Sequence, residues 1–192
     1  MDAKLTPVQS QSFFIFSQGR FNKTFLFHSI ILFEMVFSLF AKMPATPAYA
    51  LAYTVNSLAD TDDGTCNVAN CTLREAINAA NLNPGIDTIT VPAGTINVDM
   101  ATFNGFNITD DLIINGAGYN ETILDGGVEP SIAPSNYYTV ISINNANVTL
   151  RNMRIQRGST TGYGGGISQT GGSLILENVR IRGNRSGGIG GG

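Results

Sequence analysis

The chain has 192 residues and a formal net charge of −3, and only 13% of its residues are charged. This low charge fraction excludes a disordered acidic or basic tail and a coiled coil, and the lack of a positive excess argues against electrostatic binding of nucleic acid. The 2 cysteines are too few for a disulfide-dense mini-protein or a four-cysteine zinc site.

Residues 1–50 have the features of an export signal. Basic residues precede an apolar run over 25–41, and small residues follow it, with Ala48 and Ala50 at the −3 and −1 positions that signal peptidase reads. We therefore expect a signal peptide over 1–50, bacterial-type export and cleavage after Ala50, and the long leading region points to a misplaced start codon. The alternative is an uncleaved membrane anchor, in which Glu34 would cost about 2.5–3.5 kcal/mol at the bilayer centre.

Export would place the rest of the chain, 51–192, at the cell surface or in the medium as a secreted protein. This segment has 7 Arg and 12 acidic residues but no Lys and no His. It therefore lacks the commonest general base and metal ligand and the Schiff-base amine. It cannot form a Walker-type phosphate loop, which needs a Lys. We expect neither a nucleotide nor a nucleic acid as a partner.

Residues 51–86 are expected to form an N-terminal cap that begins with a β-prone strand over 51–55. Cys66 and Cys71 follow a turn-rich acidic loop. Because an exported protein folds in an oxidising compartment, we expect a disulfide between them. A loop this small gains little from loop closure, so the expected role of the disulfide is to hold the loop in shape before a helix. The C-x4-C spacing does not match a redox site.

The best-specified element is a short amphipathic helix. Thr72 and Glu75 have the spacing of a capping box, in which the hydroxyl and the carboxylate accept backbone N–H groups at the helix start. Apolar residues follow at helical spacing: Leu73, Ala76, Ile77 and Ala80. The Asn-Pro-Gly at 83–85 ends the helix. Arg74 is expected to form a structural salt bridge at the surface or at the cap rather than a catalytic site.

Four stretches in this part of the chain resemble the CSLREA domain, in that family's order. They are Tyr53-Thr54-Val55-Asn56-Ser57 with Ala59-Asp60-Thr61, Cys66 with Cys71-Thr72-Leu73-Arg74-Glu75-Ala76-Ile77, Asn81 with Pro84-Gly85-Ile86-Asp87-Thr88-Ile89, and Pro92-Ala93-Gly94-Thr95. The resemblance covers roughly residues 52–97, and Thr72 stands where the family name has Ser. It implies an exported protein in which this element caps the open end of a right-handed parallel β-helix, and it implies no catalytic residues.

Beyond the cap, short apolar alternations separated by Gly, Asn and Asp predict an all-β region over 87–192. The decisive pattern is a self-match at a shift of 26 residues, in which 147–155 aligns with 173–181. The parity of the apolar positions changes at Asn152 and Asn178, as expected for a strand, a sharp bend and a second strand that face one core. The two Asn side chains would then stack as a ladder at the bend.

The predicted fold class is all-β, a right-handed parallel β-helix (solenoid) with an N-terminal capping strand, disulfide loop and short amphipathic helix. The Gly-rich segments at 162–166 and 187–192 fit tight corners rather than a phosphate-binding loop, because no helix follows them. The chain stops inside such a corner without a visible C-terminal cap, so we expect it to be the N-terminal fragment of a longer reading frame.

Charge is divided along the predicted solenoid. Residues 51–150 have a net charge of −10, and residues 151–192 have a net charge of +5. We expect Arg154 and Arg180 on one outer face, with Arg182 close by, and Arg matches the geometry of carboxylate and sulfate groups. An acidic polysaccharide or a cell-envelope component is therefore a candidate partner. The alternative is a solvated face that discourages lateral strand pairing.

The one candidate cofactor is Ca²⁺, and no motif requires a cofactor. Asp60, Asp62 and Asp63 share a loop that could supply several of the six to eight oxygen ligands of this ion, although such turns are common without metal. Asp110 and Asp111 are adjacent, so on a strand they point to opposite faces and make a poor acid–base pair.

Two functions remain. The favoured one is a non-catalytic exported module, a structural or adhesin-like β-helix at the cell surface. The alternative is a carbohydrate-active enzyme on the same scaffold, such as a lyase of acidic polysaccharides in which Arg is the base and Ca²⁺ acidifies the α-carbon, with its site partly or wholly downstream. The fold does not decide between them, and no residue is assigned a catalytic role.

Overall fold

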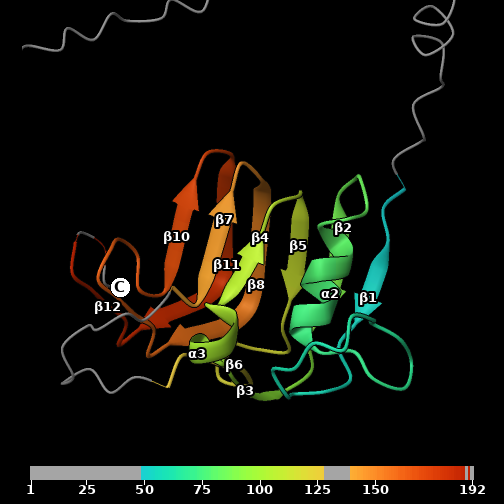
Figure 1. The fold of residues 1–192 in the computed structure, drawn as a ribbon, viewed down its shortest axis with the longest axis horizontal. Coiled ribbons are helices and arrows are strands. Elements are labelled where there is room, and N and C mark those ends of the chain that lie inside the picture. Colours follow the sequence, from blue (N-terminus) through green and yellow to red (C-terminus); the bar gives the residue numbers. More distant parts are fainter. Residues whose placement is uncertain (1–48, 128–138, 189, 191–192) are drawn as a thin grey trace, which may run out of the picture. The chain divides into compact units, whose positions relative to one another are not determined.

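The computed structural model describes residues 49–127, 139–188 and 190, all of which belong to the unit Pro47–Gly192. The described chain is mostly β-strand, and every strand pairing in it is parallel. Figure 1 shows the strands side by side along this unit. The expected signal peptide lies outside the described residues, except for its last two positions.

The described strands form three sheets. The first has seven strands. Six of them pair in the order β1 (Ala52–Thr54), β2 (Asp87–Thr90), β5 (Leu112–Asn115), β8 (Asn147–Gln156), β6 (Thr122–Asp125) and β3 (Gly94–Asn97), and the seventh, β11 (Ser173–Arg182), also pairs with β8. The second has three strands: β10 (Ile167–Thr170), β7 (Ile141–Asn144) and β4 (Phe106–Ile108). The third pairs β12 (Arg185–Ser186) with β9 (Ser159–Thr160).

The chain passes through these sheets in a repeating order. β2, β3 and β4 come first, and β5, β6 and β7 pair with them in the same order. The long strand β8 then pairs with both β5 and β6, and β10 pairs with β7. Each pass therefore lies beside the one before it. Inward side chains meet in register, as Ile89, Ile114 and Leu150 do, and these three are fully buried.

The repeat of 26 residues forms the strand pair β8–β11, which is paired in the predicted register, with Leu150 opposite Leu176. Both strands bend at an Asn with positive φ, 53° at Asn152 and 54° at Asn178, a conformation that Asn adopts more readily than most residues. The Asn178 Nδ2 donates to the Asn152 Oδ1 at 2.8 Å. The predicted Asn ladder is therefore confirmed.

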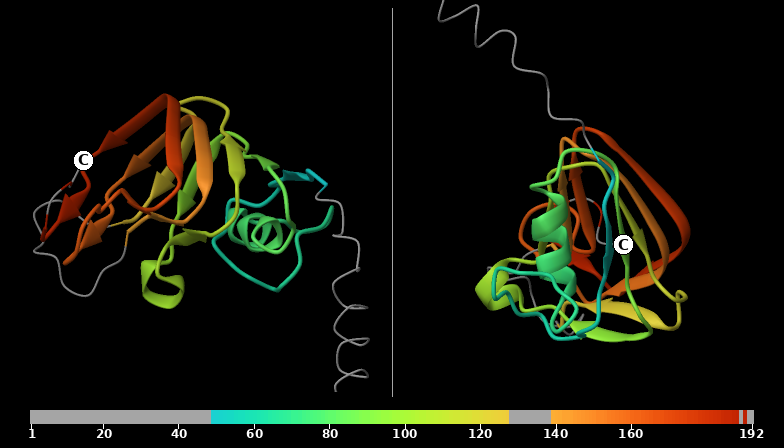
Figure 2. Two further views of the ribbon diagram at one scale, coloured as in Figure 1. Left: turned by 90° about the horizontal axis from the view of Figure 1, so that it is seen from above. Right: turned by 90° about the vertical axis from the view of Figure 1, so that its right-hand side faces the viewer.

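The predicted helix is α2 (Leu73–Ala80), and it lies at the end of the unit that holds β1 and β2, away from β11 (Figure 2). It packs against β2 and β4. Its apolar stripe joins the same core as the strands: Leu73, Ala76, Ile77 and Ala80. A second helix, α3 (Met100–Phe103), was not predicted, because four residues are too few to show an apolar stripe.

Candidate functional site

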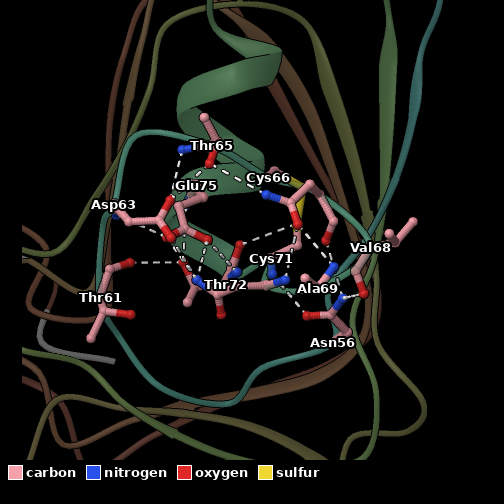
Figure 3. The surroundings of a disulfide bond; sticks show 12 residues. Asn56, Thr61, Asp63, Thr65, Cys66, Val68, Ala69, Cys71, Thr72 and Glu75 are labelled. Atoms are coloured by element: carbon pink, nitrogen blue, oxygen red, sulfur yellow. Dashed lines mark hydrogen bonds between the residues drawn. A yellow bond between two sulfur atoms is a disulfide. The ribbon is translucent and has the colours of Figure 1, made fainter.

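A disulfide between Cys66 and Cys71 holds the loop before α2, which confirms the predicted pairing. Figure 3 shows the Asn56 side chain beside this disulfide. The Asn56 amide donates to the carbonyl oxygens of Asn67 and Val68, at 3.2 and 3.1 Å. Its Oδ1 accepts the Cys71 N–H at 2.8 Å. The disulfide and this amide together fix the shape of the loop, which is a structural role.

The capping box joins α2 to the same loop. The Thr72 Oγ1 accepts the Glu75 N–H at 3.2 Å, and the Glu75 Oε2 accepts the Thr72 N–H at 2.8 Å. The Thr72 hydroxyl also donates to the Thr61 carbonyl at 2.8 Å, and the Glu75 Oε1 accepts the Asp63 N–H at 3.0 Å (Figure 3). Thr72 and Glu75 are both buried, so these hydrogen bonds set the start of the helix and the path of the loop.

The three Asp residues of the acidic loop are engaged separately. Asp60 forms a salt bridge with Arg74 at 2.7 Å, and Asp62 accepts the Asn78 amide at 2.8 Å. The pKa of Asp63 lies below its usual value because its carboxylate accepts hydrogen bonds from the Thr65 N–H, the Thr65 hydroxyl and the Asn70 amide. Among the described residues, no group of three or more His, Cys, Asp or Glu side chains is placed to hold a metal ion. The structure thus does not gather the Ca²⁺ candidates into one site.

Arg74 forms the predicted structural salt bridge, at the helix start and buried rather than at the surface. Its guanidinium donates to the two Asp60 oxygens at 2.7 and 2.8 Å and to the Gly105 carbonyl at 2.7 Å. The ring centroids of Phe103 and Phe106 lie 4.4 and 4.8 Å from the Arg74 Cζ. This bidentate, aromatic-flanked pair ties the acidic loop and α2 to the chain that leads into β4.

A hollow of about 400 Å³ lies between β1 and the disulfide loop. The residues that line it include Tyr53, Thr54, Asn56, Cys66 and Val68. Burial, followed by the negative charge of Asp87, raises the pKa of Tyr53 above its usual value, so its hydroxyl stays protonated at neutral pH. The hollow offers an apolar wall and neutral hydrogen-bonding groups.

The predicted basic residues come together on the β8–β11 pair. Arg154 and Arg180 are in register on these two strands, and Arg182 lies two residues further along β11. Arg180 and Arg182 are exposed, and Arg154 is half-buried. None of the three forms a salt bridge with a described residue. We call these three residues the arginine surface.

Two other arginines of this region are neutralised by carboxylates. Arg151 on β8 pairs with Glu177 on β11 at 2.7 Å, and Arg157 pairs with the buried Asp125. Burial raises the pKa of Asp125, but hydrogen bonds from Arg157 and Gln156 outweigh it and hold the pKa below its usual value. Among the residues that the structure describes, no salt bridge compensates the positive charge of the arginine surface. Like charges directly opposite on neighbouring strands destabilise the pair.

Asp110 and Asp111 are used in the turn before β5. Asp110 accepts the Asp111 N–H at 2.8 Å, and Asp111 accepts the Asn147 N–H at 2.7 Å. Two other carboxylates, Asp87 and Asp125, are buried, and the sequence did not indicate a role for them. They accept hydrogen bonds from residues 36 and 32 positions away, and neither lies in a motif that would have pointed to its partner.

A scan against protein-family models found no match, and searches of curated proteins and of solved structures found none either. In the part of the chain that the structure describes, no helix is long and apolar enough to cross a membrane.

Proposed function

We propose that this chain is an exported β-helix module that binds acidic polysaccharide through the arginine surface and has a structural or adhesive role rather than a catalytic one. Its fold would be a right-handed parallel β-helix, in which each pass of the chain is one rung. The parallel pairings, the repeating order of the strands and the Asn ladder support this fold.

The segment before β2 is proposed to be a CSLREA-type cap for this solenoid. A solenoid needs such an element because its first rung would otherwise expose both its core and a strand edge. The apolar stripe of α2, buried in the common core, supports this role, and so do the disulfide, the capping box and Arg74. Export follows from the signal peptide expected over 1–50.

One observation carries the binding function: Arg154 and Arg180 lie in register on adjacent strands with no carboxylate partner among the described residues. Adjacent strands are about 4.8 Å apart, so the two guanidinium groups repel each other unless an anion lies over them. Each guanidinium fork can hold a carboxylate or sulfate group with two hydrogen bonds. A polymer that repeats such groups neutralises several arginines at once, which favours an acidic polysaccharide over a neutral one.

The experiment measures binding of polygalacturonate, alginate and dextran to the exported protein at low and high salt. We expect the two acidic polymers to bind and dextran not to bind, and the affinity to fall with added salt because the attraction is screened. Arg180→Gln with Arg182→Gln should weaken binding at least about tenfold, since hydrogen bonds to charged groups contribute about 1.5–3 kcal/mol each.

Single variants separate the arginine surface from the effect of net charge. Arg180→Gln and Arg151→Gln remove the same charge from the same strand pair, but only Arg180 belongs to the proposed site, so Arg151→Gln should change binding little. Arg180→Lys keeps the charge without the planar fork and should fall between the two. Equal weakening by the two Gln variants would refute the site. Release of unsaturated product from either acidic polymer would refute the non-catalytic role.

A further inference from the structure

The fold buries the carboxylate of Asp87, the first residue of β2, without fully satisfying it. The residue is 0% exposed, and within the described part of the chain no cation forms a salt bridge with it. Its Oδ1 accepts the Leu51 N–H at 2.7 Å and the Asn83 amide at 2.9 Å, whereas its Oδ2 has no hydrogen-bond partner among the same residues. An ionised carboxylate in such a place is costly unless a cation or further donors reach it.

The backbone donor to Asp87 comes from the residue that would begin the mature chain. Leu51 follows the expected cleavage site after Ala50, and its carbonyl oxygen accepts the Thr88 N–H at 2.9 Å. The carbonyl of Tyr49, on the other side of the site, accepts the Asn83 amide at 2.7 Å. Cleavage would therefore leave the Leu51 carbonyl bonded to β2 and release the Asn83 amide from Tyr49.

We propose that signal cleavage creates an ion pair between the new α-ammonium group of Leu51 and the buried carboxylate of Asp87, and that this pair locks the N-terminal strand onto the module. The inference rests on the export and the cleavage after Ala50 that the proposed function includes. Hydrolysis of the Ala50–Leu51 peptide bond consumes one water. It leaves a carboxylate on Ala50 and an amine on Leu51, and the amine takes up the proton that the new carboxyl group loses.

The ammonium group suits Asp87 better than the amide that it replaces. It supplies three N–H donors in place of one, so both carboxylate oxygens can accept a hydrogen bond. It also supplies the positive charge that the buried carboxylate lacks, which makes the hydrogen bonds shorter and stronger. β1 is a strand of three residues whose described partner is β2 alone. An ion pair at Leu51, one residue before β1, would therefore decide whether β1 stays paired with β2.

The rate at which the α-amine is acylated measures this ion pair directly. The chain over 51–192 has no Lys, so the α-amine would be its only primary amine and the only target of an amine-acylating reagent. The full chain is exported, the mass of the product is measured, and the product is then acylated under native conditions and in urea. We expect the native rate to be lower by at least about tenfold, because an ammonium group paired with a carboxylate holds its proton more tightly than a free one.

Two substitutions test whether Asp87 is the cause. Asp87→Asn removes the charge and should raise the native rate toward the rate in urea. Asp111→Asn is the matched control, because that carboxylate also accepts a backbone N–H, from Asn147 at 2.7 Å, and it should leave the native rate low. If Asp87→Asn does not fold, the wild-type chain can be acylated in urea and refolded, and its urea midpoint should then be lower than that of the unmodified chain.

The outcomes keep the two proposals apart. A product that begins at Leu51, with an amine that reacts as fast under native conditions as in urea, overturns the ion pair and leaves export standing. A product with a different N-terminus overturns both the cleavage after Ala50 and the ion pair, because no ammonium group would form on Leu51. Polysaccharide binding is still decided separately by the arginine variants.

Discussion

Helix α2 covers the core at one end of the row of strands. At the other end of the row, β11 has β8 as its one described partner in the first sheet (Figure 2). At the α2 end, Ile77 and Ile89 are both buried. At the β11 end, Leu176 is 43% exposed, although its register partner Leu150 on β8 is 0% exposed. The comparison teaches that the burial of a side chain depends on a neighbouring strand on each side and not on the position of the residue in the repeat.

Charged pairs follow the same division. The pair of Arg74, on α2, with Asp60 is almost wholly buried, whereas the Arg151–Glu177 pair, between β8 and β11, is open to solvent. A buried charge is costly once its partner is removed, and an exposed charge is not, because water replaces the partner. Substitutions at the two ends should therefore differ in effect even where the chemistry of the change is similar.

The largest effect is expected at the α2 end. Arg74→Met keeps much of the side-chain bulk but leaves the Asp60 carboxylate buried and unpaired, which should lower the free energy of unfolding by about 3–5 kcal/mol. Urea denaturation followed by circular dichroism measures the loss. Arg74→Met combined with Asp60→Asn should recover most of it, since no unpaired charge remains. A loss below about 1 kcal/mol in the single variant would mean that this pair behaves like an exposed one.

A matched pair of truncations tests the comparison within the repeat itself. Leu150→Ala should cost about 2–5 kcal/mol, because it leaves a cavity in a packed core. Leu176→Ala, at the equivalent position one copy later, should cost less than about half as much, because water already reaches a large part of that side chain. Equal losses in urea denaturation would contradict the comparison and would mean that another copy or another segment covers β11 in solution.

Local chemistry made part of this molecule predictable. The capping box at Thr72 and Glu75 predicted where α2 begins, because its hydrogen bonds join residues three positions apart. The repeat predicted the stacking of Asn152 and Asn178, because a parity change in the apolar pattern requires a bend at the same place in both copies. In both cases the sequence interval itself carries the structural information.

The contacts that were missed join residues that no motif relates. Leu51 meets Asp87 across 36 positions, and Arg157 meets Asp125 across 32, so neither partner could be chosen without the fold. β10 could not be located within the predicted all-β region for a different reason: its sequence, Ile167–Thr170, is largely polar and does not alternate as a half-buried strand does. The arginine surface was predicted in outline, but the register of Arg154 with Arg180 needed the structure.

The smallest effect is expected from Arg151→Gln, at the β11 end. The hydrogen bond from Arg151 holds the pKa of Glu177 below its usual value. A carboxylate with a lowered folded-state pKa stabilises the folded protein above its unfolded pKa of about 4.3, and this contribution is lost as the pH falls through the folded-state pKa. Wild type should therefore melt slightly above the variant at pH 7, and the difference should disappear once the pH is below the folded-state pKa of Glu177.

Both side chains of this pair face solvent, so the shift in Tm at pH 7 should be below about 2 °C, and it should shrink further in 1 M salt, where the Debye length is about 3 Å. Glu177→Gln provides the control, because it removes the titrating group and should abolish the pH dependence of the difference. A shift that persists below the folded-state pKa of Glu177 or in high salt would show that Arg151 stabilises β8–β11 by packing rather than by charge. The β11 end would then resemble the α2 end, where the Arg74 side chain packs against Phe103 and Phe106 as well as pairing with Asp60.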